Sequence, residues 1–253
     1  MCDVGQGDAV ILRSGEGRAV LVDAGPDPPA VDRCLDRFGV EVLDAVLLTH
    51  LHADHVDGLT GALAGRAVGR VLVGPVAEPA EADARIRRTA AARGIPVVVV
   101  RAGDRLRVGE VDVAVWSPVR RIAAGSVPNN ASLVLAARSG SVDALLLGDV
   151  EREAARDLLL RMRREPSMAA AARGFEVVKT PHHGSANLDE ELMAAVRSPL
   201  AVISVGADND YGHPAARHLE VLRRGGSVVL RTDLHGDVAV VERGGDVRAV
   251  TSR

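Results

Sequence analysis

Three histidines and one aspartate fall within six consecutive positions of this chain: His50, His52, Asp54 and His55. They follow the apolar run 44–49, which predicts a buried strand, so the cluster should lie on the loop at the end of that strand. His50 and His52 alternate, so their side chains point to the same side of an extended chain. Asp54 and His55 then begin a turn. A lone histidine is more often structural than a ligand, but this spacing favours binding of two adjacent metal ions.

Two later segments place further candidate ligands after expected strands. Asp149 follows an apolar run and could bridge two metal ions. Asp149 could instead cap the helix expected from Glu151, because aspartate is favoured at that position, and we favour the bridging role. His182 and His183 follow the expected strand 176–178, and adjacent side chains point in different directions. We expect one of them to bind metal and the other to face substrate or donate a proton.

Divalent ions held by these residues would support hydrolysis. Two cations about 3.5–4 Å apart clamp the attacking and leaving oxygens of a displacement, and a bound water titrates near pH 7. Imidazole and carboxylate ligands suit Zn²⁺, Mn²⁺ or Fe. We therefore predict one or two divalent ions, Zn or Mn, with Asp54 and His182 as the catalytic groups.

Several polar residues could support such a site. Asp23 follows an apolar run and could be a turn residue or could orient a ligating imidazole, and we favour the second role. His213 precedes Pro214, and it or the following helix N-terminus could contact a phosphate, although a simple turn is nearly as good an interpretation. Positive charge for a phosphate could come from Lys179, Arg120 and Arg121, but the two arginines equally suit an exposed loop. His218 and His235 are interpreted as structural or surface residues.

The elements that must position these residues alternate along the chain. Strands are expected at 9–12, 19–22, 45–48, 70–73, 97–100, 111–115, 132–136, 144–147, 176–178, 201–204, 227–230 and 238–241. Helices are expected at 29–38, 78–93, 151–163, 188–196 and 214–222. We predict an α/β chain forming one domain, 1–253, with two pseudo-halves, 1–125 and 126–253, and two sheets packed face to face with helices outside.

Composition lacks the usual signals of nucleic-acid binding, of a disulfide framework and of a membrane span. The net charge of −3 provides no strong basic field for nucleic acid. Aromatic residues make up 2% of the chain, so stacking surfaces for single strands are nearly absent. Cys2 and Cys34 form no disulfide framework and no C-x-x-C pair, and they say little about compartment. No signal peptide and no apolar stretch of about 18 residues is present, so the chain as given is expected to be soluble.

Seven short segments occur in an order typical of one family. They are Asp3–Ala9, Leu21–Gly25, Thr49–His55, Asn129–Val134, Leu147–Asp149, Pro181–Ser185 and Tyr211–Pro214. The histidine-rich segment resembles the metallo-β-lactamase superfamily. The full set resembles the C-terminal metallo-β-lactamase-like domain of ComEC-type DNA-uptake (competence) proteins over nearly the whole chain. The resemblance implies a four-layer αββα sandwich, with two mixed sheets flanked by helices, and metal-dependent phosphodiesterase activity.

The resemblance also implies a ligand set. His50 and His52 would hold one ion; Asp54, His55 and one of His182 and His183 would hold the other, with Asp149 between them. Many superfamily members add a third histidine to the first site, where this chain has Asn129, Asn130 and Ser132. That site could complete its shell with asparagine or water, or prefer a harder ion such as Mn²⁺. Residues expected to support ligands or contact substrate are Asp23, Asn129, Asn130, Ser132, Lys179, Ser185 and His213.

The family's role implies partners as well. In the family this domain is thought to degrade the DNA strand that is not imported, so DNA is the expected substrate. Full-length members carry a transmembrane channel, and such a membrane channel domain is a second expected partner, with this domain outside the cytoplasm. The chain could be a fragment, a standalone paralogue or the product of a mis-started gene, and the oligomeric state stays open.

Three functions compete. The first is a nuclease or phosphodiesterase that uses a metal-activated water in competence-type DNA uptake. The second is a small-molecule hydrolase of the same superfamily, such as a lactonase, thioesterase or phosphocholine esterase, which the net charge suits at least as well. The third is a non-catalytic binding module, against which the complete ligand set argues.

Overall fold

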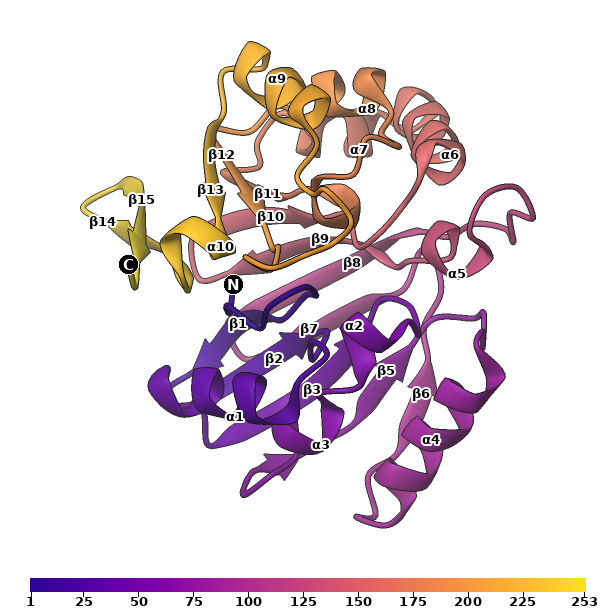
Figure 1. Cartoon of the computed structure of the whole chain (residues 1–253), viewed down its shortest axis with the longest axis vertical. Helices are drawn as coiled ribbons and strands as arrows, with labels where there is room; N and C mark the ends of the chain where they lie inside the picture. The colour runs from indigo at the N-terminus through magenta and orange to yellow at the C-terminus, as the bar shows by residue number, and fades with distance from the viewer.

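Two mixed β-sheets packed face to face form the centre of the molecule (Figure 1). The computed structural model describes all residues, 1–253. The first sheet has the order β1-β2-β3-β5-β6 with β4 beside β3, and comprises β1 Val10–Gly15, β2 Arg18–Val22, β3 Val42–Leu48, β4 Ala67–Val68, β5 Val71–Val73 and β6 Val97–Val99. The second runs from β13 to β7 in reverse chain order, and comprises β7 Arg105–Val108, β8 Val111–Ser117, β9 Val134–Ser139, β10 Val142–Leu146, β11 Val177–Lys179, β12 Leu200–Ile203 and β13 Val228–Arg231.

Helices cover the outer face of each sheet (Figure 1). The first sheet carries α1 Pro28–Arg37, α3 Leu59–Ala62 and α4 Ala80–Ala91, and the second carries α6 Arg152–Arg164, α7 Pro166–Ala171, α8 Glu190–Ala195 and α9 Ala216–Arg224. The remaining elements are α2 Ala53–Val56, α5 Val127–Asn130, the 3-10 turn Pro181–Gly184, α10 Thr232–His235 and the hairpin β14 Val238–Arg243 with β15 Asp246–Thr251. This arrangement confirms the predicted αββα fold.

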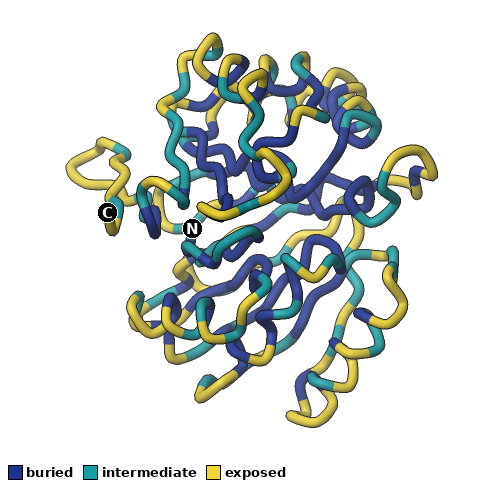
Figure 2. The backbone as a smooth tube through the Cα atoms, viewed as in Figure 1, coloured by how far each residue is buried: buried dark blue, intermediate teal, exposed yellow.

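Alternating side chains of the strands hold the layers together, because successive residues of a strand point to opposite faces. In β2, Ala19 and Leu21 pack under the helices of the first sheet, whereas Val20 and Val22 pack between the two sheets. A third apolar cluster, which includes Leu145, joins the second sheet to its own helices. Figure 2 shows the result as buried chain along the sheets and exposed chain on the outer surfaces of the helices.

The candidate site residues directly follow the carboxyl ends of parallel strands in both sheets. β2 and β3 are parallel, and Asp23 and His50 follow them. β10, β11 and β12 are also parallel, and Asp149, His182 and Ser204 follow these strands. Sites in open α/β sheets form outside the carboxyl ends of parallel strands, so this topology gathers the candidate residues of both sheets.

The boundary between the two halves differs from the predicted one at residue 125. The chain passes from the first sheet to the second between β6 and β7, so β7 and β8 already belong to the second sheet. The reason is that β8 pairs with β9 in antiparallel fashion over most of its length. β7 was not predicted, because it is an edge strand with alternating exposed arginines rather than an apolar run.

The two cysteines correct a second expectation. Cys2 and Cys34 form a disulfide, with their Cα atoms 5.9 Å apart across 32 residues of sequence. The bond ties the first residues of the chain to α1. The spacing of two isolated cysteines carries no pairing signal, and tertiary packing alone brings them together. No helix of the molecule is both long and apolar enough to cross a membrane.

Candidate metal centre

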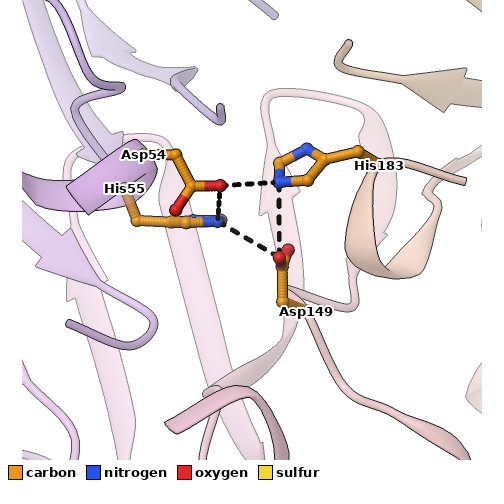
Figure 3. Close-up of side chains that lie close together, drawn as sticks. All are labelled: Asp54, His55, Asp149 and His183. Carbon is orange, nitrogen blue, oxygen red and sulfur yellow. Dashed lines mark hydrogen bonds and ion pairs between the residues drawn. The ribbon is translucent and has the colours of Figure 1, made fainter. Parts of the chain in front are cut away.

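Four side chains converge on one point between the sheets: Asp54, His55, Asp149 and His183 (Figure 3). His183 Nε2 lies 3.1 Å from Asp54 Oδ2 and 3.3 Å from Asp149 Oδ2. His55 Nε2 lies 3.4 Å from Asp149 Oδ2 and 3.7 Å from Asp54 Oδ2. Ligand atoms about 2.0–2.2 Å from a tetrahedral Zn²⁺ lie about 3.3–3.6 Å from one another. The four separations, 3.1–3.7 Å, span this range, and the four atoms all lie within 4.8 Å of one another, close enough for one ion to contact them.

Short segments after three strands present these ligands. Asp54 and His55 lie in α2, the single helical turn that follows β3, and Asp149 follows β10. His183 lies in the turn after β11, where His182 and His183 have φ of 49° and 50°. The left-handed conformation costs a residue with a Cβ about 1–2 kcal/mol, and such strain gathers at functional sites.

Hydrogen bonds orient both imidazoles toward the centre. His55 Nδ1 lies 2.9 Å from Asp23 Oδ2, and His183 Nδ1 lies 2.9 Å from the carbonyl oxygen of Ser204. Because both partners accept, each Nδ1 carries a proton, and each Nε2 points to the centre, where its lone pair is available when the ring is neutral. His55 Nε2 is buried and has no hydrogen-bond partner, which is the environment of a nitrogen that binds a cation.

The carboxylates of the centre change the pKa values of the neighbouring imidazoles. Burial opposes charge on His55, but the carboxylates of Asp149 and Asp23 outweigh it and raise the pKa of His55 well above its usual value. The pKa of His183 is raised well above its usual value against the same burial, by Asp149 and Asp8. In the metal-free protein, protons on these imidazoles supply the positive charge that the carboxylates require. A divalent cation fits the same place.

His50 and His52 form a second pair beside the first group. His50 Nε2 lies 3.1 Å from His52 Nδ1, and the ring of His50 is centred 4.1 Å from that of His55. Ser132 Oγ lies 3.3 Å from His50 Nδ1 and accepts a hydrogen bond from the backbone of Asp149. Burial, followed by the neighbouring charge of His55, places the pKa of His50 well below its usual value. A neutral imidazole is the form that binds metal.

His182 lies at the rim of the centre. Its Nε2 is 3.9 Å from Asp149 Oδ2, and 23% of its side chain is exposed, against 2% for His183. Its ring meets that of His213 edge to face, with ring centres 5.5 Å apart. Of the two neighbouring histidines, His183 is therefore the one placed within the ligand group, and His182 and His213 line the approach to it.

Lys179 lies behind the ligands and does not face substrate. Its ammonium group is buried, forms an ion pair with Asp8, and donates a hydrogen bond of 2.9 Å to the carbonyl oxygen of Gly148. It also lies 3.5 Å from Asp149 Oδ1. Arg120 and Arg121 are exposed and pair with surface carboxylates. None of the three cations is free to neutralise a phosphate at the centre, which corrects that expectation.

Asp8 is the functional residue that sequence reasoning did not single out. Its Oδ1 lies 3.5 Å from His183 Nδ1 and its Oδ2 lies 3.7 Å from His55 Nδ1. Burial raises the pKa of Asp8, but the charge of Lys179, followed by that of His183, brings it below its usual value. Its one signal was its place in the segment Asp3–Ala9, which carries the family resemblance.

No hydrogen bond joins the side chains of Asn129 and Asn130 to the four ligands. Asn130 Oδ1 accepts hydrogen bonds of 3.2 Å from the backbone of Glu151 and of Ala154, and Asn129 Nδ2 donates to Glu151. Asn130 thus holds the start of α6, whereas Asn129 Oδ1 is buried without a hydrogen-bond partner, and the expectation that asparagine or water completes a metal shell stays a prediction. Ser185 accepts through its carbonyl oxygen from His218, which is buried.

Known proteins resemble this chain over most of its length. A family model of the metallo-β-lactamase superfamily matches residues 2–206. ComE operon protein 3 of Bacillus subtilis (strain 168) is 31% identical, over 94% of this chain and 32% of the relative. Competence protein ComA of Neisseria gonorrhoeae is 27% identical, over 92% and 30%. The chain therefore spans about a third of the length of these relatives.

Solved structures share the fold at low sequence identity. The metallo-β-lactamase fold protein YhfI from Bacillus subtilis has a TM-score of 0.56 at 10% identity, covering 91% of this chain and 94% of that one. Zn²⁺-bound PqqB from Methylobacterium extorquens has a TM-score of 0.54 at 13% identity, covering 88% and 84%. With the family model spanning most of the chain, and with two mixed sheets flanked by helices, this chain belongs to the metallo-β-lactamase superfamily.

Proposed function

We propose that this chain is a metal-dependent phosphodiesterase that cleaves DNA. The observation that carries the proposal is the convergence of four ligand atoms within 4.8 Å of one another, with His55 Nε2 buried and without a hydrogen-bond partner. The alignment of nearly the whole chain with ComE operon protein 3 and Competence protein ComA supports the proposal, because the sequence resembles DNA-uptake proteins. A shorter stretch of 66 residues is 38% identical to Ribonuclease Z of Clostridioides difficile (strain 630), covering 24% of this chain and 21% of that one.

The opening of the centre is defined by exposure. Asp54 has 33% of its side chain exposed and His182 has 23%, whereas His55, Asp149 and His183 are at most 3% exposed. Substrate therefore approaches past Asp54 and His182, the two residues predicted to be catalytic. Divalent ions at the centre supply Lewis acidity and lower the pKa of a coordinated water to near 7.

The residues of the chain then divide the remaining work. Burial lowers the pKa of His182, so its ring is neutral near pH 7 and can accept or share a proton at the rim. Asp23 and Ser204 fix the tautomers of His55 and His183. Lys179 neutralises Asp8 and part of the charge on Asp149. Within DNA uptake, a membrane channel domain is the partner that we propose would deliver the strand.

The experiment is metal add-back with an inactivating variant. Chelated wild-type protein and Asp149→Ala would be given Mn²⁺ or Zn²⁺, and cleavage of linear DNA and metal content would be measured together. We expect wild-type protein to recover cleavage and Asp149→Ala to lose both cleavage and metal, with an unchanged circular dichroism spectrum. Asp157→Ala is the matched control, because Asp157 pairs with Arg120 on the surface. Metal-loaded wild-type protein that cleaves lactones or thioesters but no phosphodiester would refute the proposal.

A further inference from the structure

Tyr211 is the one aromatic side chain that the fold leaves exposed. Trp116 and Phe175 are buried against each other, with ring centres 5.6 Å apart, and Phe38 packs partly buried on the core of the first sheet. Tyr211 is 74% exposed. A single exposed apolar group is common on protein surfaces, so its surroundings decide whether Tyr211 has a role.

Three near-parallel rings connect Tyr211 to the candidate metal centre. The ring of Tyr211 stacks on that of His213 at 5.9 Å between centres and 26° between planes. The ring of His213 in turn stacks on that of His183 at 6.5 Å and 28°. Both separations lie in the range of about 4.5–7 Å typical of aromatic pairs. The outer face of Tyr211 thus ends a row of rings that begins at a candidate ligand.

The loop that carries Tyr211 is closed by one side chain. Asn209 lies in the connection between β12 and α9, drawn in orange in Figure 1. Its amide nitrogen donates hydrogen bonds of 2.8 Å to the carbonyl oxygen of Gly206 and 2.9 Å to that of His213. Its oxygen accepts one of 3.0 Å from the backbone of His213. Tyr211 is therefore presented in a preformed position, which reduces the entropy lost when a ligand binds.

We propose that Tyr211 is a stacking surface for an unpaired nucleobase close to the scissile phosphate, a subsite that selects single-stranded DNA. The proposal rests on the phosphodiesterase function proposed above and names its substrate class. Every base offers a π-face to an aromatic ring whatever its sequence, whereas in a duplex these faces are covered by their neighbours. Stacked nucleotides rise by about 3.4 Å each along a strand, so a few nucleotides span the two ring-to-ring steps between Tyr211 and His183.

The test compares Tyr211→Ala, Tyr211→Leu and Tyr211→Phe with the wild type. Two probes would be used: a fluorescently labelled single-stranded oligonucleotide, and the same strand with abasic residues. Dissociation constants would be measured by fluorescence anisotropy with a phosphorothioate backbone that resists cleavage, and KM and kcat with the ordinary backbone. We expect Tyr211→Ala and Tyr211→Leu to weaken binding and raise KM about tenfold, with kcat within about twofold. Tyr211→Phe should match the wild type.

The abasic strand separates stacking from a structural effect. All four proteins should bind it equally, and their thermal unfolding midpoints should agree, because Tyr211 is exposed. Equal binding of the base-containing strand by wild type, Tyr211→Ala and Tyr211→Leu would overturn the proposal. The proposal would also be overturned if Tyr211→Ala and Tyr211→Leu lost as much affinity for the abasic strand as for the base-containing strand. If wild-type protein binds through Tyr211 but cleaves no phosphodiester, the base subsite stands and the proposed function fails.

Discussion

His182 and His183 show how two neighbouring residues acquire different roles. Both have positive φ, and the turn sends one ring into the buried ligand group and leaves the other at the rim. The sequence predicts that adjacent side chains diverge, but it leaves open which one binds metal. The turn conformation places His183, and not His182, among the four candidate ligands.

Substitution of each histidine should therefore give a distinct result. We expect His183→Ala to lose about one metal ion per chain, because it removes a nitrogen that lies 3.1–3.3 Å from two carboxylate oxygens. His182→Ala should keep its metal and lose cleavage rate by about a hundredfold or more, the usual contribution of a group that handles protons. Elemental analysis and initial rates measure the two effects. Loss of metal in His182→Ala with retention in His183→Ala would reverse the assignment.

Site residues that are close together in the sequence could be predicted to lie together, whereas those far apart in the sequence could not. His50, His52, Asp54 and His55 share one motif, so their common position could be predicted from spacing alone. Asp8 and Lys179 form a buried ion pair between segments far apart in the chain. No local pattern marks such a contact, because it arises only when the sheets pack. Two roles were expected for Lys179, support of the ligands or contact with substrate, and its burial and its two carboxylate partners favour the first.

At the scale of elements, buried strands were predictable because each is a short apolar run. β4, β7 and β15 were not. β4 has two residues, β7 alternates exposed arginine with partly buried apolar residues, and β15 is mostly exposed. The start of α6 was expected at Glu151, and the helix begins at Arg152. What the sequence could not indicate is that Asn130 satisfies this helix terminus from another segment.

We expect Asn130→Ala to destabilise the fold without emptying the centre. The change removes the acceptor of the backbone N–H groups of Glu151 and Ala154, and a buried donor left unsatisfied costs about 1–3 kcal/mol. The free energy of unfolding from urea titration of metal-saturated protein should fall by at least this amount, with metal content unchanged. Asn187→Ala serves as the control, because that asparagine is only partly buried. A variant that loses metal before it loses stability would return Asn130 to the metal site.

At the scale of the whole molecule, the centre joins the two sheets. Asp54 and His55 follow β3 of the first sheet, and Asp149 and His183 follow β10 and β11 of the second. The disulfide adds a covalent link near the same region, since Cys2 begins the segment that carries Asp8. Bound metal and the disulfide should therefore both increase the free energy of unfolding of the whole molecule.

Loss of the disulfide should destabilise the protein by about 3–4 kcal/mol, the loop-entropy value for a closed loop of this size. The measurement is the urea midpoint of wild-type protein with and without reductant. A Cys2→Ser, Cys34→Ser double variant should match the reduced protein, and reductant should not shift its midpoint further. An unchanged wild-type midpoint under full reduction would show that the bond contributes nothing to the fold.

Removal of metal should make stability depend on pH in a defined direction. Burial lowers the pKa values of His55 and His183, but the neighbouring carboxylates raise them by more. Both pKa values therefore lie well above the unfolded value of about 6.5. Their protonation therefore stabilises the metal-free fold fully below about pH 6.5, and this contribution is lost as pH rises through the folded pKa values. Each proton contributes up to about 1.4 kcal/mol per pH unit in that window.

We therefore expect the urea midpoint of chelated protein to fall as pH rises above about 6.5. The metal-loaded protein should show the opposite trend over the same range, because metal binds only deprotonated imidazoles and its affinity rises with pH. The two curves should diverge as pH increases, and addition of metal to the chelated protein at the alkaline end should restore the higher midpoint. A flat curve for the chelated protein would mean that His55 and His183 are not held as cations between the carboxylates, and that the centre is not poised for a divalent ion.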